Sequence, residues 1–252
     1  MATTGTTSDS TPGTTSGAPP AGCAECRGIE LTEAVEDYLK AVFTLTARGE
    51  SASTSGIAAR LAVAPPTVSA MLHRLCDGGL VERTGWGRVV LTGHGETHAH
   101  AVVRRHRLLE TFLHQVLGVP WDELHADAEV LEHHLSGRLE ELIDAALGFP
   151  DRDPHGDPIP RASSPHEEHG ETPLADSAPG ADFLVQRVYD ADSAALRHLA
   201  GLGIGPGVRL RVGARPSPAG PMRVQVGECE QVLSCAVVNL IHGRVEGPEV
   251  EA

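Results

Sequence analysis

The order of elements within residues 31–92 constrains the fold more than any other feature of this sequence. Apolar residues recur there at spacings of three and four, as on the buried face of an α-helix. The pattern predicts helices over residues 31–48, 56–61 and 65–77. Pro65 and Pro66 suit the first turn of the third helix, because a missing N–H loses no hydrogen bond there.

Two short strands are predicted directly after these helices. Residues 80–83 and 88–92 flank a turn at Gly85-Trp86-Gly87, which indicates a hairpin. Three helices followed by a hairpin are typical of a winged helix-turn-helix, whose last helix enters the major groove of DNA. A generic small α/β module with the same pattern is the alternative.

The charge of the chain argues against DNA binding by electrostatic attraction alone. The formal net charge is −14, and residues 29–92 carry six Lys and Arg side chains against seven Asp and Glu. The DNA-binding interpretation therefore rests on motif and geometry. A cation bound by acidic residues outside this module would lessen the repulsion from DNA phosphate.

The rest of the chain divides into a helical part and a part rich in strands. Helices are predicted over about 94–117, 121–135 and 136–147. Residues 150–180 hold seven prolines, which indicates a linker. After it, strands are expected over 183–188, 208–212, 222–226, 231–233 and 237–241, and a short helix over 193–200. This pattern predicts a small β-barrel.

The N-terminal residues and the cysteines carry little structural information. Ten of the first twenty residues are Ser or Thr, so we expect residues 1–28 to be a disordered tail. Cys23 and Cys26 have the spacing of half a zinc site, but no second pair follows, and an incidental pair is the simpler interpretation. Five cysteines without framework spacing, no long apolar run and no secretory pattern favour a cytoplasmic protein without a membrane partner.

Histidine and carboxylate spacing indicates a metal site in the helical part. Eight of the fourteen histidines lie between positions 94 and 134. His106 and Glu110 share one helix face. A second face is predicted to carry His125, Glu129, Glu132 and His133. Two antiparallel helices with these faces opposed would bring the clusters together. A simply solvated Glu/His face is the alternative.

The type of donor limits the metal and the class of protein. Imidazole and carboxylate ligands without thiolate suit Mn(II), Fe(II), Co(II) or Zn(II), and the carboxylates favour the harder ions. The HExxH pattern is absent, as are a phosphate loop and a Ser/His/Asp arrangement. We therefore expect no enzyme. A metalloenzyme and a metal-storage or carrier protein that does not bind DNA are the alternatives from other classes.

Several of these motifs together resemble one known family. Residues 35–45 (VEDYLKAVFTL), 66–69 (PTVS), 105–110 (RHRLLE), 129–136 (EVLEHHLS) and 153–160 (DPHGDPIP) are similar to the diphtheria toxin repressor and manganese transport regulator family. The resemblance covers about residues 31–245. It implies a metal-dependent transcriptional repressor that controls metal-ion homeostasis genes.

The resemblance also implies a division of the chain into parts. A winged helix-turn-helix DNA-binding domain is expected at 29–92, and a helical metal-binding and dimerisation domain at 93–149. A Pro-rich linker at 150–181 leads to an SH3-like β-barrel domain at 182–247. The expected fold class is mainly α with a small amount of β structure.

The resemblance assigns the ligands to two sites. It implies a primary site of Asp37, Glu129, Glu132 and His133. It implies an ancillary site of His106, Glu110 and His125, joined by Asp190 and, beside it, Ser193 from the SH3-like domain.

Two of these positions bear on the metal. Iron-sensing members have Met and Cys where this chain has Asp37 and Glu129, and carboxylates in place of sulfur favour Mn(II). Mn(II) is therefore the expected cofactor, with Fe(II) as the alternative. Short manganese regulators carry a Glu where this chain has Lys40, and an ammonium group cannot bind a metal, which makes a paired-metal site doubtful.

The expected partner is double-stranded operator DNA, bound by a homodimer. A pseudo-palindromic operator would present its half-sites about one helical turn apart. Thr67 and Ser69 are candidate phosphate or base contacts on the third helix, with helix capping as the alternative role. The candidate phosphate contacts are Arg60, Arg74, Arg83 and Arg88.

Overall fold

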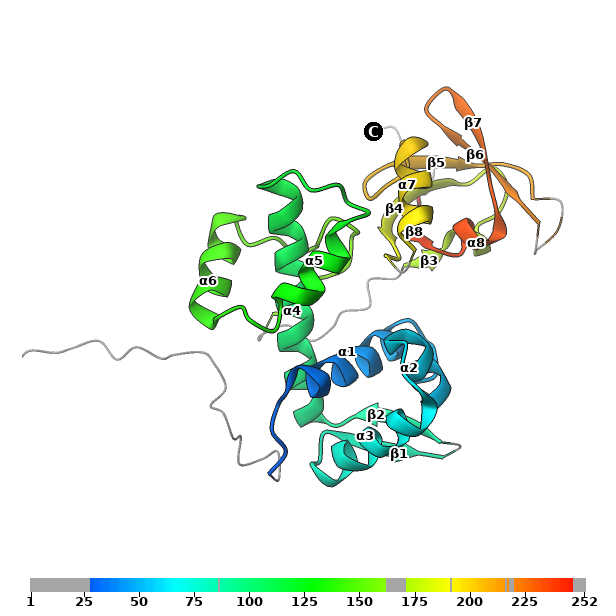
Figure 1. The fold of residues 1–252 in the computed structure, drawn as a ribbon. Coiled ribbons are helices and arrows are strands. Elements are labelled where there is room, and N and C mark those ends of the chain that lie inside the picture. Colours follow the sequence, from blue (N-terminus) through cyan, green and yellow to red (C-terminus); the bar gives the residue numbers. More distant parts are fainter. Residues whose placement is uncertain are drawn as a thin grey trace, which may run out of the picture.

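The computed structural model describes residues 28–161 and 171–246, apart from positions 86, 191, 216, 218 and 219. The predicted tail with Cys23 and Cys26 lies outside the described residues. Three bodies are visible in Figure 1, and the long helix α4 reaches from the first body into the second. Within the described ranges, no helix has both the length and the apolar character needed to cross a membrane.

The first body has the predicted order of three helices and a hairpin. It consists of α1 (Glu33–Ala47), α2 (Thr54–Leu61), α3 (Pro65–Asp77), β1 (Val81–Thr84) and β2 (Arg88–Leu91). Thr32 and Ser53 cap α1 and α2 with their side-chain oxygens. Pro65 begins α3, as the sequence indicates. The strands β1 and β2 pair antiparallel, so that the hairpin closes the body as its wing.

The second body is helical and shares α4 with the first. It contains α4 (Gly93–Gln115), α5 (Leu124–Leu131) and α6 (Gly137–Ala146). Near the start of α4, Ala99 and Val103 pack into the core of the first body. Leu108 and Leu113, further along, pack with α5 and α6. One continuous helix therefore links the DNA-binding type of module to the helical body that contains α5 and α6 (Figure 1).

Helix α5 is shorter than predicted. It ends at Leu131 rather than near residue 135, with Glu132 as its C-cap. Glu132 keeps helical dihedral angles (φ −60°, ψ −33°), so its carboxylate continues the face begun by His125. His133 and His134 lie in the turn that follows.

Residues 150–161, predicted as linker, are packed against α4. The Arg104 guanidinium donates to the carbonyl oxygen of Pro160 at 3.1 Å, and Arg107 donates to that of Pro158. Gly156 has a φ of +89°, and a Cβ there would lie 1.9 Å from the carbonyl oxygen of Gln186. Only glycine fits this close approach to the third body. Hydrogen bonds and close backbone contacts thus hold the proline-containing residues 150–161 in place.

The third body is a six-stranded antiparallel sheet with short helices. Its strands are β3 (Thr172–Pro173), β4 (Asp182–Val188), β5 (Arg209–Val212), β6 (Met222–Val226), β7 (Cys229–Leu233) and β8 (Ile241–Glu246). Helix α7 (Ser193–Gly201) packs its apolar face into the same core. The strand order is β3-β8-β4-β5-β6-β7, so among the described strands the sheet stays open rather than closing into the expected barrel.

Two predictions for the third body were wrong. Residues 237–241 were predicted as a strand, but α8 (Cys235–Val238) lies there and β8 begins only at Ile241. Ser234 explains the difference, because its hydroxyl accepts the N–H of Val237 and starts a helical turn. The short strand β3 lies in the segment predicted as linker, where it pairs with β8.

Candidate metal centre

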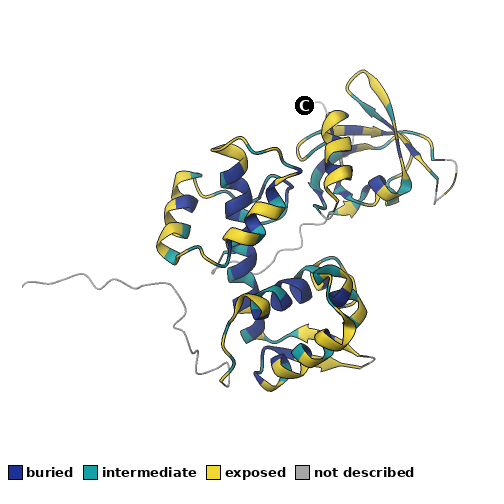
Figure 2. Ribbon diagram, in the orientation of Figure 1, coloured by how far each residue is buried: buried dark blue, intermediate teal, exposed yellow. Residues whose placement is uncertain are grey.

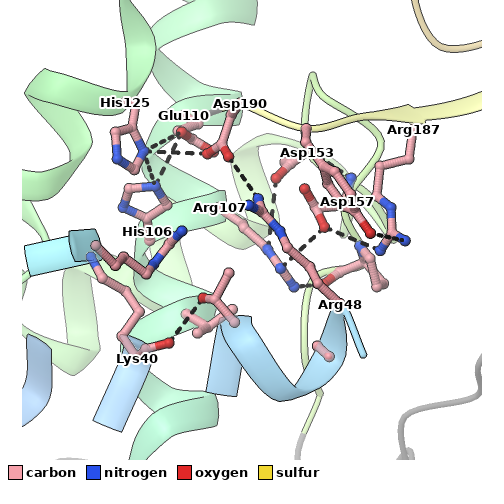
Figure 3. Close-up of a pocket in the computed structure, with 16 residues that line it drawn as sticks. Lys40, Arg48, His106, Arg107, Glu110, His125, Asp153, Asp157, Arg187 and Asp190 are labelled. Atoms are coloured by element: carbon pink, nitrogen blue, oxygen red, sulfur yellow. Dashed lines mark hydrogen bonds and ion pairs between the residues drawn. The ribbon is translucent and has the colours of Figure 1, made fainter. Parts of the chain in front are cut away.

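Four predicted ancillary ligands converge from three parts of the chain. His106 and Glu110 come from α4, His125 from α5, and Asp190 from the segment directly after β4 (Figure 3). His106 Nε2 lies 3.1 Å from Glu110 Oε1 and 3.1 Å from His125 Nδ1. His125 Nδ1 lies 3.3 Å from Asp190 Oδ2. Ser193, also expected here, is exposed and does not belong to this group of described residues.

Burial and neighbouring carboxylates determine the charge of this group. The Glu110 side chain is 1% exposed. Burial lowers the pKa of His106, but the Glu110 and Glu132 carboxylates outweigh burial and raise the pKa to about 9. Burial is likewise outweighed at His125, where Asp190 and Glu110 raise the pKa to about 10. Without a metal, protons on the imidazoles balance the carboxylates, so a cation would replace these protons.

Three predicted primary ligands form a second group. It consists of Asp37 from α1 with Glu132 and His133 from the end of α5. His133 Nε2 lies 3.0 Å from Asp37 Oδ1 and 3.5 Å from Glu132 Oε1. Burial raises the pKa of the Asp37 carboxyl, against the neighbouring His133 and Lys40. This group joins the first body directly to the second.

Glu36 supports His133 from behind, a role that the sequence analysis missed. His133 Nδ1 lies 2.7 Å from Glu36 Oε2, and Arg105 holds the other Glu36 oxygen at 2.8 Å. A carboxylate on one ring nitrogen leaves the other nitrogen free for a metal, as in many metal-binding histidines. The signal in the sequence was an acidic residue directly before Asp37.

The fourth predicted primary ligand, Glu129, lies on the other side of Glu132. Together with His106, these two glutamates form a further group of donor atoms. The ammonium of Lys40 lies between the two carboxylates, hydrogen-bonded to Glu129 and at 2.5 Å from Glu132. Lys40 is the only lysine of the chain. The ammonium group of Lys40 thus lies at the position where the short manganese regulators are expected to have a further carboxylate.

A buried group that the sequence analysis did not single out adjoins the first one. Glu110, Asp153 and His155 are all buried and offer donor atoms within 4.8 Å of one another. His155 Nε2 lies 2.8 Å from the carbonyl oxygen of Trp121, which leaves Nδ1 facing Glu110 Oε2 at 3.7 Å. The motif at 153–160 was visible in the sequence as part of the family resemblance, but nothing marked its side chains as donors.

The donor set fits a divalent metal ion. The groups found among the described residues offer imidazole nitrogens and carboxylate oxygens, which suit Mn(II) and Fe(II). A cavity of about 50 Å³ touches His106, Glu110, His125 and Asp190. It has room for an ion or waters but not for a sizeable organic ligand.

The candidate DNA contacts divide into two sets. Thr67, Arg74, Arg83 and Arg88 are exposed on α3 and the wing, and Ser69 is half-buried. Among the described residues, no side chain caps α3, so the hydroxyls of Thr67 and Ser69 do not serve as its N-cap. Arg60 lies elsewhere, lining the cavity beside Arg48 and Asp190, a position that gives no support to its predicted phosphate contact.

Family models match the three bodies in order. Residues 30–86 match the iron dependent repressor N-terminal DNA binding domain. Residues 92–161 match the iron dependent repressor metal binding and dimerisation domain, which extends through the packed segment after α6. Residues 172–244 match the FeoA domain.

Individual proteins are similar to this chain over different lengths. The iron-dependent repressor IdeR of Mycobacterium tuberculosis is 38% identical over 131 residues, which are 52% of this chain and 57% of that protein. The match thus spans little more than half of that relative. The transcriptional regulator MntR of Escherichia coli is 40% identical over 124 residues, 49% of this chain and 77% of that protein.

Solved structures extend the likeness to all three bodies. A manganese-dependent transcriptional repressor in complex with manganese has a TM-score of 0.79 at 41% identity, covering 84% of this chain and 100% of that chain. The manganese regulator SloR has a TM-score of 0.73 at 32% identity, covering 84% and 98%.

Proposed function

Since this chain belongs to the iron-dependent repressor family, which includes the diphtheria toxin repressor and the manganese transport regulators, we propose that it is a metal-dependent transcriptional repressor. It binds operator DNA as a homodimer and controls metal-ion homeostasis genes. The proposed action on DNA supports a cytoplasmic location.

The observation that carries this proposal is the group of Asp37, Glu132 and His133. Asp37 lies on α1, which packs beside the helix-turn-helix, whereas the other two lie on the metal-binding body. These three residues would hold a divalent ion, which would supply positive charge between the two bodies. These residues would then hold α1 in one orientation relative to the second body. If the metal binds this orientation more tightly than others, metal binding favours the arrangement that fits DNA.

Mn(II) is the proposed metal. Asp37 and Glu129 offer carboxylate oxygens, and neither group found around them contains sulfur. Hard oxygen donors suit Mn(II), while Fe(II) remains the second candidate on the same ligands. Lys40 between Glu129 and Glu132 favours a single ion at the primary ligands over a pair.

The proposed dimer forms through the second body. Its family model is a metal binding and dimerisation domain. Leu117, Leu139 and Leu142 are exposed by 60%, 47% and 52%, and they line an apolar groove with residues of α4 and α5. Figure 2 shows exposed stretches on α6, the outer helix of this body. A second copy covering this groove would pair two winged helices.

A regulatory role fits the metal site better than catalysis. The side chains of Glu110 and Glu132 are 1% and 0% exposed, and ligand groups surround them on several sides. Catalytic sites keep an open coordination position and a nearby general base, for which these ligands leave little room. A carrier protein would use the same ligands, but it would give the helix-turn-helix no role.

DNA selection with the purified full chain tests the proposal. Sheared genomic DNA is captured in excess Mn(II) or in excess chelator and then sequenced. We expect a few enriched fragments that share a pseudo-palindromic motif, with Mn(II) only. An anaerobic arm with Fe(II) at the same free concentration should enrich them less. Equal enrichment with chelator would contradict metal-dependent repression, and stronger enrichment with Fe(II) would contradict the choice of metal.

A further inference from the structure

An arginine at the end of α1 contacts the third body. Arg48 is the C-cap of α1. Its Nη2 lies 3.2 Å from Asp190 Oδ1, and its guanidinium carbon lies 4.1 Å from the centre of the Tyr189 ring. The side chains of Arg48 and Asp190 are only 12% and 14% exposed, so solvent screens this ion pair weakly. Figure 3 shows Arg48 pointing at Asp190.

Tyr189 is fixed within the third body. Its N–H donates to the carbonyl oxygen of Leu240 at 2.9 Å, just before β8. Its ring packs against His242 with the ring centres 4.4 Å apart, and its hydroxyl accepts from Arg187. Turning the ring away from Arg48 would cost its packing against His242 and its hydrogen bond from Arg187.

Asp190 divides its two oxygens between two other bodies. Oδ1 accepts from Arg48 of the DNA-binding module, and Oδ2 faces His125 of α5 at 3.3 Å. Burial opposes ionisation of Asp190, but the His125 hydrogen bond and charge keep its pKa below the ordinary value. One carboxylate thus lies where all three bodies meet.

The DNA-binding module presents two positively charged side chains to the cavity that contains Asp190. Arg60 of α2 lines the same cavity as Arg48 and Asp190. Burial lowers the pKa of the Arg60 guanidinium, and the charge of Arg48 lowers it further. Two guanidinium groups of one body thus face a carboxylate of another, and movement of Asp190 would leave both less well compensated.

We propose that Arg48, Tyr189 and Asp190 form an interdomain clasp that passes the state of the His106–Glu110–His125–Asp190 group to the end of α1. Arg48 is a positioning residue in this clasp, because it contacts Asp190 and is not itself one of the proposed metal ligands. The inference rests on the proposed function, in which that group binds metal. With an ion held by this group, Asp190 would be fixed beside His125 through Oδ2 and would keep Oδ1 on Arg48. By reciprocity, loss of Arg48 weakens metal binding at the group.

The first test uses hydrogen–deuterium exchange on the metal-free full chain. Arg48→Gln should speed exchange about tenfold at residues 186–190 as well as at 44–48. The cap of α1 is made by the Arg48 backbone N–H, which the substitution keeps, so local fraying does not explain a change in the third body. Arg211→Gln removes an exposed ion pair with Asp182 and serves as the matched control. Unchanged exchange at 186–190 in Arg48→Gln would overturn the clasp.

The second test measures coupling to the metal. In a His133→Ala background, Mn(II) is titrated and free ion is followed by electron paramagnetic resonance. Arg48→Gln should lower Mn(II) affinity about five- to tenfold, and Arg48→Lys less, since it keeps the charge without the planar group. In an Asp190→Asn background the loss should vanish. An equal loss in both backgrounds, or none in either, would overturn the proposal.

The two tests separate this proposal from the function on which it rests. If the His133→Ala chain binds no Mn(II) while Arg48 is intact, the metal-binding role of the group is contradicted, and with it the link from metal to clasp. If Mn(II) binds but Arg48→Gln leaves its affinity unchanged, the clasp alone is contradicted. Circular dichroism of each variant verifies that it folds. If Arg48→Gln does not fold, Arg48→Lys takes its place in both measurements.

Discussion

Lys40 distinguishes this metal centre from one built only of acidic and imidazole ligands. Its side chain is 8% exposed and contacts Glu129 and the fully buried Glu132. A buried carboxylate needs a compensating charge, and Lys40 supplies part of it when no metal is present. The ammonium therefore stabilises the metal-free protein and competes with a metal for the same oxygens.

Lys40→Gln should separate these two effects. We expect the free energy of unfolding of the metal-free chain to fall by roughly 1–3 kcal/mol, because Glu132 loses a charged partner in a buried site. The affinity for Mn(II) should rise, because no ammonium has to leave the carboxylates. Chemical unfolding in chelator and a Mn(II) titration measure the two quantities. Lower Mn(II) affinity in the variant would contradict the competition.

The histidines of the four-residue group give a pH dependence with a definite sign. Their pKa values of about 9 for His106 and about 10 for His125 lie above the ordinary 6.5. A group whose pKa is raised on folding stabilises the fold below its unfolded pKa, and this contribution disappears as pH rises through the folded value. The metal-free fold should therefore weaken between about pH 6.5 and pH 10.

Thermal melts in chelator at about pH 6.5 and pH 9.5 measure this trend. The midpoint should be lower at the higher pH. Glu110→Gln removes a carboxylate that raises both pKa values, so it should reduce the difference between the two midpoints. A midpoint that rises toward pH 9.5 in the unmodified chain would show that these imidazoles are not protonated in the metal-free fold.

At the scale of elements, α3 and the wing carry the proposed DNA contacts. Arg83 on β1 and Arg88 on β2 are both exposed, and β1 packs against α3, the predicted recognition helix. The module has no large positive surplus, so single phosphate contacts should matter more than in a strongly basic domain.

Arg83→Gln should weaken binding to a selected DNA fragment about tenfold and reduce the slope of log affinity against log salt by about 1. Metal affinity should not change, because Arg83 belongs to none of the ligand groups. Arg211→Gln in the third body is the control with the same change of charge. Fluorescence anisotropy over a series of salt concentrations measures the slope, and an unaltered slope would exclude a phosphate contact.

Periodicity predicted the helices well, because apolar faces and caps are local features. The capped starts of α1 and α2 and the Pro65 start of α3 follow from short sequence signals. Local signals failed at 237–241, where β-branched residues suggested a strand and the Ser234 cap produced α8. The proline count suggested a free linker over 150–161, but contacts with α4 that are distant in sequence hold it in place.

The candidate site was predictable only where its ligands share a helix. The i, i+4 spacing identified His106 with Glu110, and the face of α5 identified His125 with Glu129. Asp37 and Asp190 came from the family resemblance, because no spacing relates them to α4. Glu36 and His155 were missed, since their roles depend on which side chains face them after folding.

For the whole molecule, the family predicted from sequence motifs is confirmed by matches to all three bodies. The assembly depends on the surface through which two copies of the chain form the proposed dimer. Leu142 on α6 is 52% exposed in a groove of apolar side chains. A second copy would cover this surface and set the distance between two recognition helices.

Leu142→Glu should therefore dissociate the dimer, because it places a charge in the apolar interface. Sedimentation velocity should give about half the mass of the unmodified chain, and binding to selected DNA should fall about a hundredfold or more, since two half-sites would no longer be bound together. Val232→Glu changes a 58% exposed valine on β7 and should leave the dimer intact. A dimeric Leu142→Glu chain would place the interface elsewhere.

The central claim is that a metal shared by Asp37 and the end of α5 enables the winged helix to bind DNA. Its most direct test is fluorescence anisotropy of a DNA fragment selected with Mn(II), measured for the unmodified chain, Asp37→Ala, His133→Ala and the exposed control Asp182→Ala. We predict that Mn(II) strengthens binding at least about a hundredfold in the unmodified and control chains, and that this gain disappears in the other two while they remain folded. Undiminished Mn(II)-dependent binding by folded Asp37→Ala or His133→Ala would contradict the claim.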